Sequence, residues 1–167
     1  MSKLAARVRL WHDQFFALVS YLQSPFLLFV RLYWGWQLAQ SGWGKLHNLS
    51  KVTDFFTSLN LPFPAQTAVA ISSLELFGGI FLALGLLSRT TALVLTANMF
   101  MAYVTADREA LFSVFSDPDK FSAAAPFTFL VASVIVLLFG PGKIALDTLL
   151  RSLTSAPDLQ ESRSISN

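Results

Sequence analysis

Residues 66–87 read QTAVAISSLELFGGIFLALGLL, a long apolar run that is interrupted by one charged side chain, Glu75. A helix that crosses the hydrocarbon core of a membrane needs about 20 largely apolar residues. A charge at the centre of a bilayer costs at least about 2.5 kcal/mol, so Glu75 is expected to face other helices and to find a partner there. This stretch therefore predicts a membrane-spanning helix and an all-α integral membrane protein.

Three further segments have a similar character, namely residues 24–43, 90–106 and 121–140. The whole chain is 54% hydrophobic and only 13% charged, whereas an ordinary soluble domain has about 25% charged residues. Two connecting segments, 45–65 and 107–120, carry aromatic residues between polar ones and are expected to cap the helices at the membrane surface. We therefore predict a transmembrane four-helix bundle over residues 24–150.

The two ends of the chain are expected to differ from this bundle. Residues 1–23 form an amphipathic pattern, with apolar side chains at helical spacing at Leu4, Val8, Trp11, Phe15, Leu18 and Leu22. Because proline disfavours helix just before it, Pro25 favours a break and a separate helix in the membrane interface. The alternative is that the first spanning helix starts earlier and kinks at Pro25. Residues 151–167 are polar and rich in serine, which predicts a disordered tail.

The distribution of basic residues predicts the orientation in the membrane. If the N-terminus is inside, six basic residues lie on the inner side (Lys3, Arg7, Arg9, Arg89, Lys143 and Arg151) and four on the outer side (Lys45, Lys51, Arg108 and Lys120). Since Lys and Arg are in excess on the cytoplasmic side of membrane proteins, both termini are expected in the cytoplasm, in a multi-pass protein of the bacterial inner membrane. The absence of a basic helix face gives no support to nucleic-acid binding.

The composition also limits the cofactors. The chain has no cysteine, which excludes disulfides, iron–sulfur clusters and thiolate metal sites in this chain. Its two histidines, His12 and His47, fall at opposite ends of the predicted first helix, too far apart to ligate one haem. We therefore expect neither a metal site nor a covalently bound cofactor.

The residues expected to carry chemistry are the polar ones inside the membrane. Counting residues at 1.5 Å each places Glu75 and Asn98 near the midplane, with the long side chain of Arg31 within reach of the same layer. A buried Arg31–Glu75 pair assisted by Asn98 has two interpretations, a ligand or proton site and an ion pair that only fixes helix register. Trp34 and Trp36 beside Arg31 allow either a planar ligand such as a quinone or ordinary packing.

The motifs of the chain, taken together, resemble the DoxX family of four-helix bacterial membrane proteins. Five pieces in order carry the resemblance: Arg31 to Gly35 (RLYWG), Ser41 to Leu46 (SGWGKL), Glu75 to Gly79 (ELFGG), Leu84 to Arg89 (LGLLSR) and Gly140 to Asp147 (GPGKIALD). The resemblance implies a membrane fold and a quinone-linked redox role, and it carries over Arg31, Lys45, Glu75 and Arg89. Many members have a histidine near the end of the third helix, where this chain reads Tyr103-Val-Thr-Ala-Asp107.

Several functions therefore compete. In the first, the chain is a quinone-linked redox subunit, with Glu75 and Arg31 as the catalytic residues and Asn98, Trp34, Trp36, Lys45 and Arg89 as ligand-binding residues. In the second, it is a non-catalytic accessory or assembly subunit of a larger membrane complex. A small transporter or lipid-binding protein is a third. The expected partners are the lipid bilayer and either other membrane subunits or further copies of the chain. Whether the chain is itself an enzyme stays open.

Overall fold

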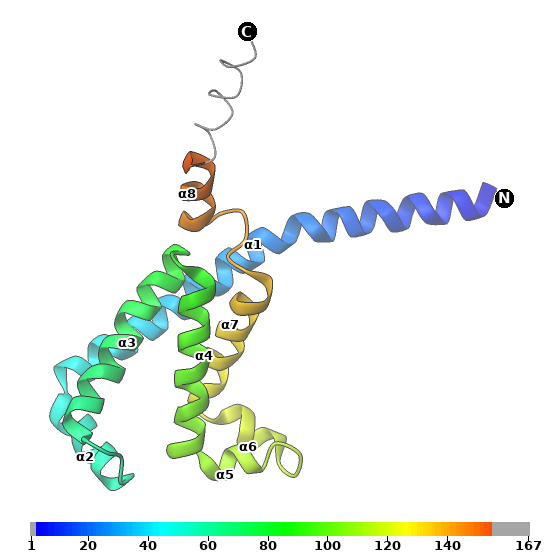
Figure 1. Cartoon of the computed structure of the whole chain (residues 1–167). Helices are drawn as coiled ribbons and strands as arrows, with labels where there is room; N and C mark the ends of the chain where they lie inside the picture. The colour runs from blue at the N-terminus through cyan, green and yellow to red at the C-terminus, as the bar shows by residue number, and fades with distance from the viewer. Residues whose placement is uncertain (1–2, 155–167) are drawn as a thin grey trace.

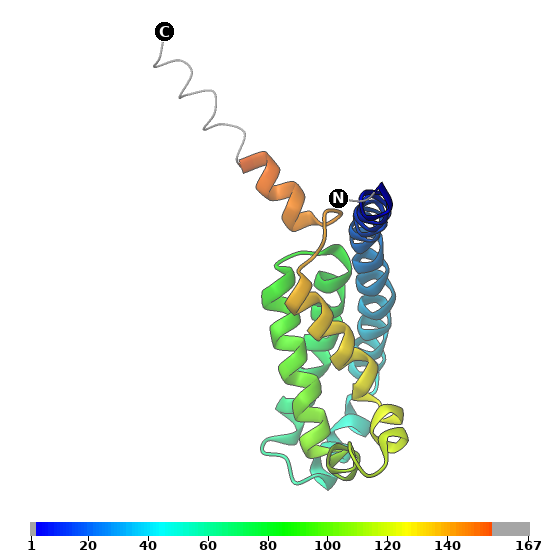
Figure 2. The same cartoon turned by 90° about the vertical axis from the view of Figure 1, so that its right-hand side faces the viewer.

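The computed structural model describes residues 3–154, and this part of the chain is helical apart from short connections. Helices α1, α3, α4 and α7 pack side by side (Figures 1 and 2). The short helices α2, α5 and α6 gather at one end of this assembly, the α2 end, and α8 leaves from the opposite end, the α8 end. The helices are α1 (Lys3–His47), α2 (Leu49–Ser58), α3 (Pro64–Leu84), α4 (Ser88–Thr105), α5 (Arg108–Phe112), α6 (Pro118–Ala123), α7 (Pro126–Phe139) and α8 (Leu146–Thr154). The all-α prediction is confirmed for the described residues.

Helix α1 differs from the expectation, because the helix does not break before Pro25. It runs as one helix of 45 residues with Pro25 inside it, a length of about 67 Å. Proline removes only one backbone hydrogen bond, and membrane helices tolerate it. The N-terminal half of α1 projects beyond the packed helices at the α8 end (Figure 1). The prediction that the helix over residues 1–23 is separate from the first spanning helix is therefore wrong.

The other predicted segments match the helices to within a few residues at most of their ends. Residues 66–87 correspond to α3 and residues 90–106 to α4. The fourth predicted segment, 121–140, is shortened at its start because α6 takes up residues 118–123 and the chain then turns into α7. Residues 151–154 of the predicted tail are helical as the last part of α8, and the rest of that tail lies outside the described residues.

The turn from α3 to α4 depends on Gly85. This residue has φ of 70°, in the left-handed region that glycine adopts at no steric cost. Two backbone bonds close the end of the helix, from the N–H of Gly85 to the carbonyl of Leu82 and from the N–H of Leu86 to that of Phe81. This Schellman pattern is a common helix end, so the local sequence alone explains why α3 stops here.

Helices α1 and α3 touch through their backbones. A Cβ atom added at Gly42 would lie 2.6 Å from the carbonyl oxygen of Ser72, and one added at Gly79 would lie 2.5 Å from the backbone nitrogen of Ala39. Small residues at such crossings allow two membrane helices to approach closely. The close approach brings the polar side chains of α1 and α3 within bonding distance of each other.

The outer surface of the packed helices is apolar. Two helices, α1 over Trp11–His47 and α3, are long and apolar enough to span a membrane, and α7 is a shorter apolar helix. Large hydrophobic side chains such as Phe29, Phe77 and Leu138 are more than half exposed, while a core of smaller aliphatic ones is buried between the helices. Such a surface suits contact with the acyl chains of a lipid bilayer.

Candidate functional site

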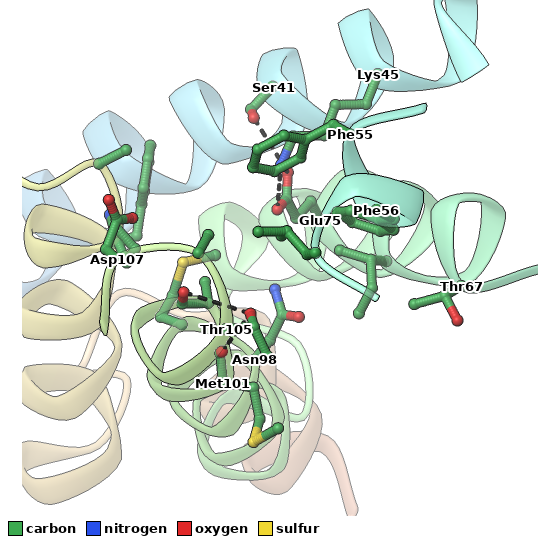
Figure 3. A pocket seen from close by; sticks show the side chains of 18 of the residues that line it. Ser41, Lys45, Phe55, Phe56, Thr67, Glu75, Asn98, Met101, Thr105 and Asp107 are labelled. Atoms are coloured by element: carbon green, nitrogen blue, oxygen red, sulfur yellow. Dashed lines mark hydrogen bonds and ion pairs between the residues drawn. The ribbon is translucent and has the colours of Figure 1, made fainter. Parts of the chain in front are cut away.

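A cavity of about 500 Å³ lies between the helices at the α2 end. Helices α1, α3, α4 and α7 form its walls and α2 lies across it with Phe55 and Phe56 (Figure 3). Most of its lining is apolar, including Leu38, Met99, Met101 and Phe129. Its polar side chains are Ser41, Lys45, Thr67, Glu75, Asn98, Thr105 and Asp107. The cavity has the size and the mostly apolar lining of a small-molecule site.

An ion pair between α1 and α3 forms the polar wall of this cavity. The Nζ atom of Lys45 lies 2.5 Å from Oε1 and 2.6 Å from Oε2 of Glu75. The hydroxyl of Ser41 donates to Oε2 of the same carboxylate at 3.0 Å. The Glu75 side chain is 5% exposed and that of Lys45 is 37% exposed. The carboxylate is therefore buried, while the side chain of its lysine partner stays partly exposed.

The position of this ion pair follows from helix geometry. Ser41 and Lys45 are four residues apart, so they lie on the same face of α1. Gly42 lies between them in the sequence and brings that face against α3 at Ser72, about one turn before Glu75, and at Leu76, the residue after it. The glycine and the polar residues of this motif therefore act together, because the close approach allows the short Ser41 side chain to reach the carboxylate.

Asn98 belongs to the same cavity but not to the ion pair. It comes from α4 and lies across the cavity from Lys45 and Ser41 (Figure 3). Its side chain makes no hydrogen bond within residues 3–154. The amide group can therefore offer both a donor and an acceptor to a ligand.

The predicted Arg31–Glu75 pair is wrong. Arg31 lies at the α8 end, where its two terminal nitrogens donate to the carbonyl oxygens of Pro141 at 2.7 Å and Ile144 at 2.6 Å. The guanidinium group packs against Gly85, the residue after α3 and ten residues beyond Glu75, a separation of about 15 Å. Depth counting from assumed helix ends placed Arg31 and Glu75 in one layer, but α1 begins much earlier than assumed, and its register against α3 is set by the glycine contacts.

The remaining predicted ligand residues lie outside the cavity. Trp34 is half-buried and packs against the hydrophobic core beside Tyr33. Trp36 is 63% exposed on the outer surface. Arg89 is exposed at the α8 end, close to Gly140. Of the predicted site residues, the structure therefore brings together Lys45, Glu75 and Asn98.

Sequence reasoning missed Ser41 and the two aromatic residues of α2. The signal for Ser41 was its place four residues before Lys45, which puts the two on one helix face. Phe55 and Phe56 belong to a segment that was expected to cap the helices, and α2 does so. Nothing in their local sequence indicates which cavity they would cover.

A second polar cluster closes the α8 end. The carboxylate of Asp147 accepts hydrogen bonds from the backbone N–H groups of Leu87 at 2.8 Å and Ser88 at 2.7 Å, at the start of α4. Leu87 has φ of 46°, unfavourable for a residue with a side chain, and the carboxylate holds it there. Burial by itself would raise the pKa of Asp147, but hydrogen bonding by Ser88 and Leu87 and the charge of Arg151 outweigh it and lower the pKa below its ordinary value.

Comparison with known proteins gives one family whose model covers the segment that lines most of the cavity. The family model described as DoxX matches residues 26–108, which contain α3, α4 and all of the cavity's polar side chains. No curated protein and no solved structure matches the chain. The closing segment with Asp147 and α8 lies beyond the matched residues. The chain belongs to the DoxX family of membrane proteins.

Proposed function

We propose that this protein is a quinone-linked redox subunit and that the cavity at the α2 end binds the ring of a quinone. The observation that carries the proposal is the Lys45–Glu75 pair in the wall of an otherwise apolar cavity between membrane helices. The redox link itself comes from the family, since its members are often associated with quinone chemistry.

The chemistry of the cavity suits a neutral ring with polar oxygens. Lys45 is matched by Glu75, and Asp107 lies at the cavity edge, so the cavity has no excess of positive charge to attract an anion. The ammonium group of Lys45 and the free amide of Asn98 can donate to carbonyl oxygens on opposite sides of a ring. Phe55, Phe56 and Phe129 supply apolar and aromatic contact with its faces.

The residues of the pair have separate roles in this proposal. A quinol becomes a quinone when it loses two electrons and two protons. Lys45 orients a carbonyl oxygen, and Glu75 accepts a proton from a quinol hydroxyl, in keeping with the reach that a general base needs. In this step the quinol is oxidised, so a small acceptor or a partner subunit takes its two electrons and its second proton; we assign this role outside the chain because the chain has no cysteine. Arg31, which lies about 15 Å away, has no part in this chemistry.

The orientation and the spanning helices belong to the same proposal. We place α1, α3, α4 and α7 across the bacterial inner membrane as a four-helix bundle, with the α8 end in the cytoplasm because Arg7, Arg89, Lys143 and Arg151 lie there. The N-terminal part of α1 then lies along the cytoplasmic interface.

Since the chain lacks cysteine, single cysteines at Thr57 in α2 and Thr154 in α8 test this topology directly. An impermeant maleimide should label Thr57→Cys in intact spheroplasts and Thr154→Cys only after lysis; the reverse pattern would invert the topology.

The quinone proposal is tested by extraction of the gently purified protein with organic solvent and measurement of quinone per chain by mass spectrometry. We expect about one quinone per chain in the unmodified protein and loss of it in Asn98→Leu, which leaves the ion pair intact. Trp36→Leu, on the outer surface, is the matched control and should retain the quinone. An absence of quinone from the unmodified protein, or equal retention in Asn98→Leu, would overturn the assignment of this cavity.

A specific observation also favours the second candidate, an accessory subunit of a larger complex. Phe63, Phe112 and Phe115 are more than two-thirds exposed at the α2 end, outside the cavity lining. Exposed aromatic side chains that gather at one end are typical of a contact surface for another protein. Under this candidate, Phe112→Ser together with Phe115→Ser should release a co-purifying partner chain while the quinone content stays unchanged. Persistence of the partner would remove these residues as its contact.

A further inference from the structure

The α8 end holds a second groove that is separate from the proposed quinone cavity. It has a volume of about 580 Å³ and lies between α1, α3, the loop after α7 and α8. Its walls are mostly apolar, from Leu28 of α1, Leu84 of α3 and Leu149 of α8. Two basic side chains line it, Arg31 and Lys143.

Arg31 carries a buried positive charge that no carboxylate in residues 3–154 pairs with directly. The residue is 1% exposed, and its terminal nitrogens donate only to backbone carbonyl oxygens. Its Nε atom is buried and has no hydrogen-bond partner among the described residues. The charge of Asp147 acts on Arg31, but its carboxylate oxygens accept hydrogen bonds from the backbone at the start of α4 and make no ion pair with the guanidinium group. Because a buried charge without an ionic partner is costly, an anion bound in the groove would stabilise the guanidinium group of Arg31.

Lys143 adds a second cation at the mouth of the groove. Its backbone N–H donates to the hydroxyl of Ser24, which ties the loop to α1. Its side chain is exposed, and the ammonium group lies 5.9 Å from the ring centre of Tyr21. Contact with the ring face leaves its other N–H groups able to donate to an anionic oxygen.

Helix α8 gives the groove an amphipathic wall. Leu146, Leu149, Leu150 and Leu153 recur at helical spacing, and all four are exposed. Asp147, Arg151 and Thr154 supply the polar positions. The helix leaves the packed helices at the same end from which α1 projects (Figures 1 and 2). A short helix of this kind beside membrane-spanning helices fits the membrane interface, where head groups meet acyl chains.

We propose that this groove binds the phosphate head group of one anionic phospholipid, with its acyl chains along Leu28 and Leu84 and with α8 lying in the interface above it. Arg31 at the floor supplies a positive charge that no carboxylate among the described residues contacts directly, Lys143 at the mouth supplies the direct donor, and the apolar walls take the chains. The groove differs in this respect from the cavity at the α2 end, whose lysine is already neutralised by Glu75.

The test compares two lipids with the same acyl chains, phosphatidylglycerol and phosphatidylcholine, by native mass spectrometry of the full-length protein in detergent. We expect one phosphatidylglycerol to bind with clear preference. Lys143→Gln should weaken its binding about fivefold, which corresponds to about 1 kcal/mol for one basic residue near an anionic lipid. Arg89→Gln removes an exposed charge at the same end but outside the groove lining, and should leave the affinity unchanged.

Two further measurements separate the possible outcomes. Leu149→Asp places a negative charge in the groove wall and should abolish the preference, whereas Leu153→Asp, on the same helix but outside the lining, should preserve it. Equal binding of the two lipids, or equal effects of Lys143→Gln and Arg89→Gln, would overturn the proposal. Displacement of phosphatidylglycerol by millimolar inorganic phosphate, with equal thermal stabilisation by phosphate alone, would identify a free anion as the ligand and overturn the lipid assignment.

Discussion

Helix α1 places one cation between helices at each end of the packed assembly, and the two cations are stabilised in different ways. Lys45 at the α2 end is paired with the carboxylate of Glu75 on α3. Arg31 at the α8 end donates to two backbone carbonyl oxygens of a loop about 110 residues further along the chain. The first arrangement is neutral and borders a cavity, whereas the second leaves a positive charge and fastens a loop.

The difference follows from the chemistry of the two side chains. A guanidinium group presents several N–H groups in a fixed planar array, so Arg31 can hold two carbonyl groups of one loop at once. A lysine ammonium is a compact point charge on a flexible stem, suited to a carboxylate and to a change of partner when a ligand enters. We therefore infer that Arg31 at the α8 end stabilises the fold by holding the loop after α7, and that Lys45 at the α2 end is the cation suited to a reaction.

The largest expected effect comes from removing the Arg31 side chain, which holds the loop after α7 through two hydrogen bonds. Arg31→Ala removes two hydrogen bonds from a charged donor and leaves two carbonyl groups without partners. At about 1.5–3 kcal/mol for each bond, the free energy of unfolding should fall by about 3–6 kcal/mol. Unfolding in mixed detergent micelles, followed by circular dichroism, measures this loss. Arg89→Ala, an exposed arginine at the same end, should change the stability by less than about 0.5 kcal/mol; similar losses in both variants would contradict the fastening role.

The next effect tests why Lys45 and Glu75 meet at all. Gly42→Ala would push a methyl group against the backbone of α3 near Ser72. Because backbone cannot move aside as a side chain can, α1 and α3 should separate, at a cost of about 1–3 kcal/mol. Gly44 provides the matched control, since nothing lies within 4 Å of an added Cβ there. Gly44→Ala should be neutral or slightly stabilising by the same unfolding measurement, and equal losses at both glycines would contradict the close contact.

A comparable effect separates stability from binding at the α2 end. Glu75→Gln leaves Lys45 without its counter-charge, and because Lys45 is 37% exposed, solvation should limit the loss to about 1–3 kcal/mol. The double variant Lys45→Met/Glu75→Leu removes both charges and should recover most of that stability. Both variants should lack bound quinone. A double variant that folds and still retains quinone would show that the pair serves only to join α1 to α3.

The smallest expected effect concerns Asp147 and pH. Its pKa is lowered in the folded protein, so its contribution is present above about pH 4, the ordinary range of an aspartate, and is lost as the pH falls through the folded value. Asp147→Ala should cost about 1 kcal/mol at neutral pH, typical of losing a cap at a helix start. Melting temperatures between pH 7 and pH 3 should fall less steeply in Asp147→Asn than in the unmodified protein. Parallel profiles would contradict this role.

The sequence predicted the helices better than their mutual positions. The apolar runs gave α3 and α4 to within a few residues, because a membrane helix satisfies its own backbone and so depends on local sequence. Glu75 and Asn98 were expected in one polar layer, because polar residues inside a membrane face neighbouring helices, and both side chains line the cavity at the α2 end. The partner of Glu75 was wrong, because a helix register depends on which small residues touch, and two helices of this length allow several registers.

The sequence by itself determined that this is an all-helical membrane protein of the DoxX family with polar residues facing inward. The composition and the lengths of the apolar segments predict an all-helical membrane fold, however the helices are arranged relative to one another. Only the tertiary structure decided that Lys45, rather than Arg31, meets Glu75, and that Arg31 instead holds the loop after α7. Those pairings depend on the backbone of α3 against Gly42 and on the side chains of Arg31 and Ala145 against Gly85, and no local pattern encodes such contacts between segments far apart in the chain.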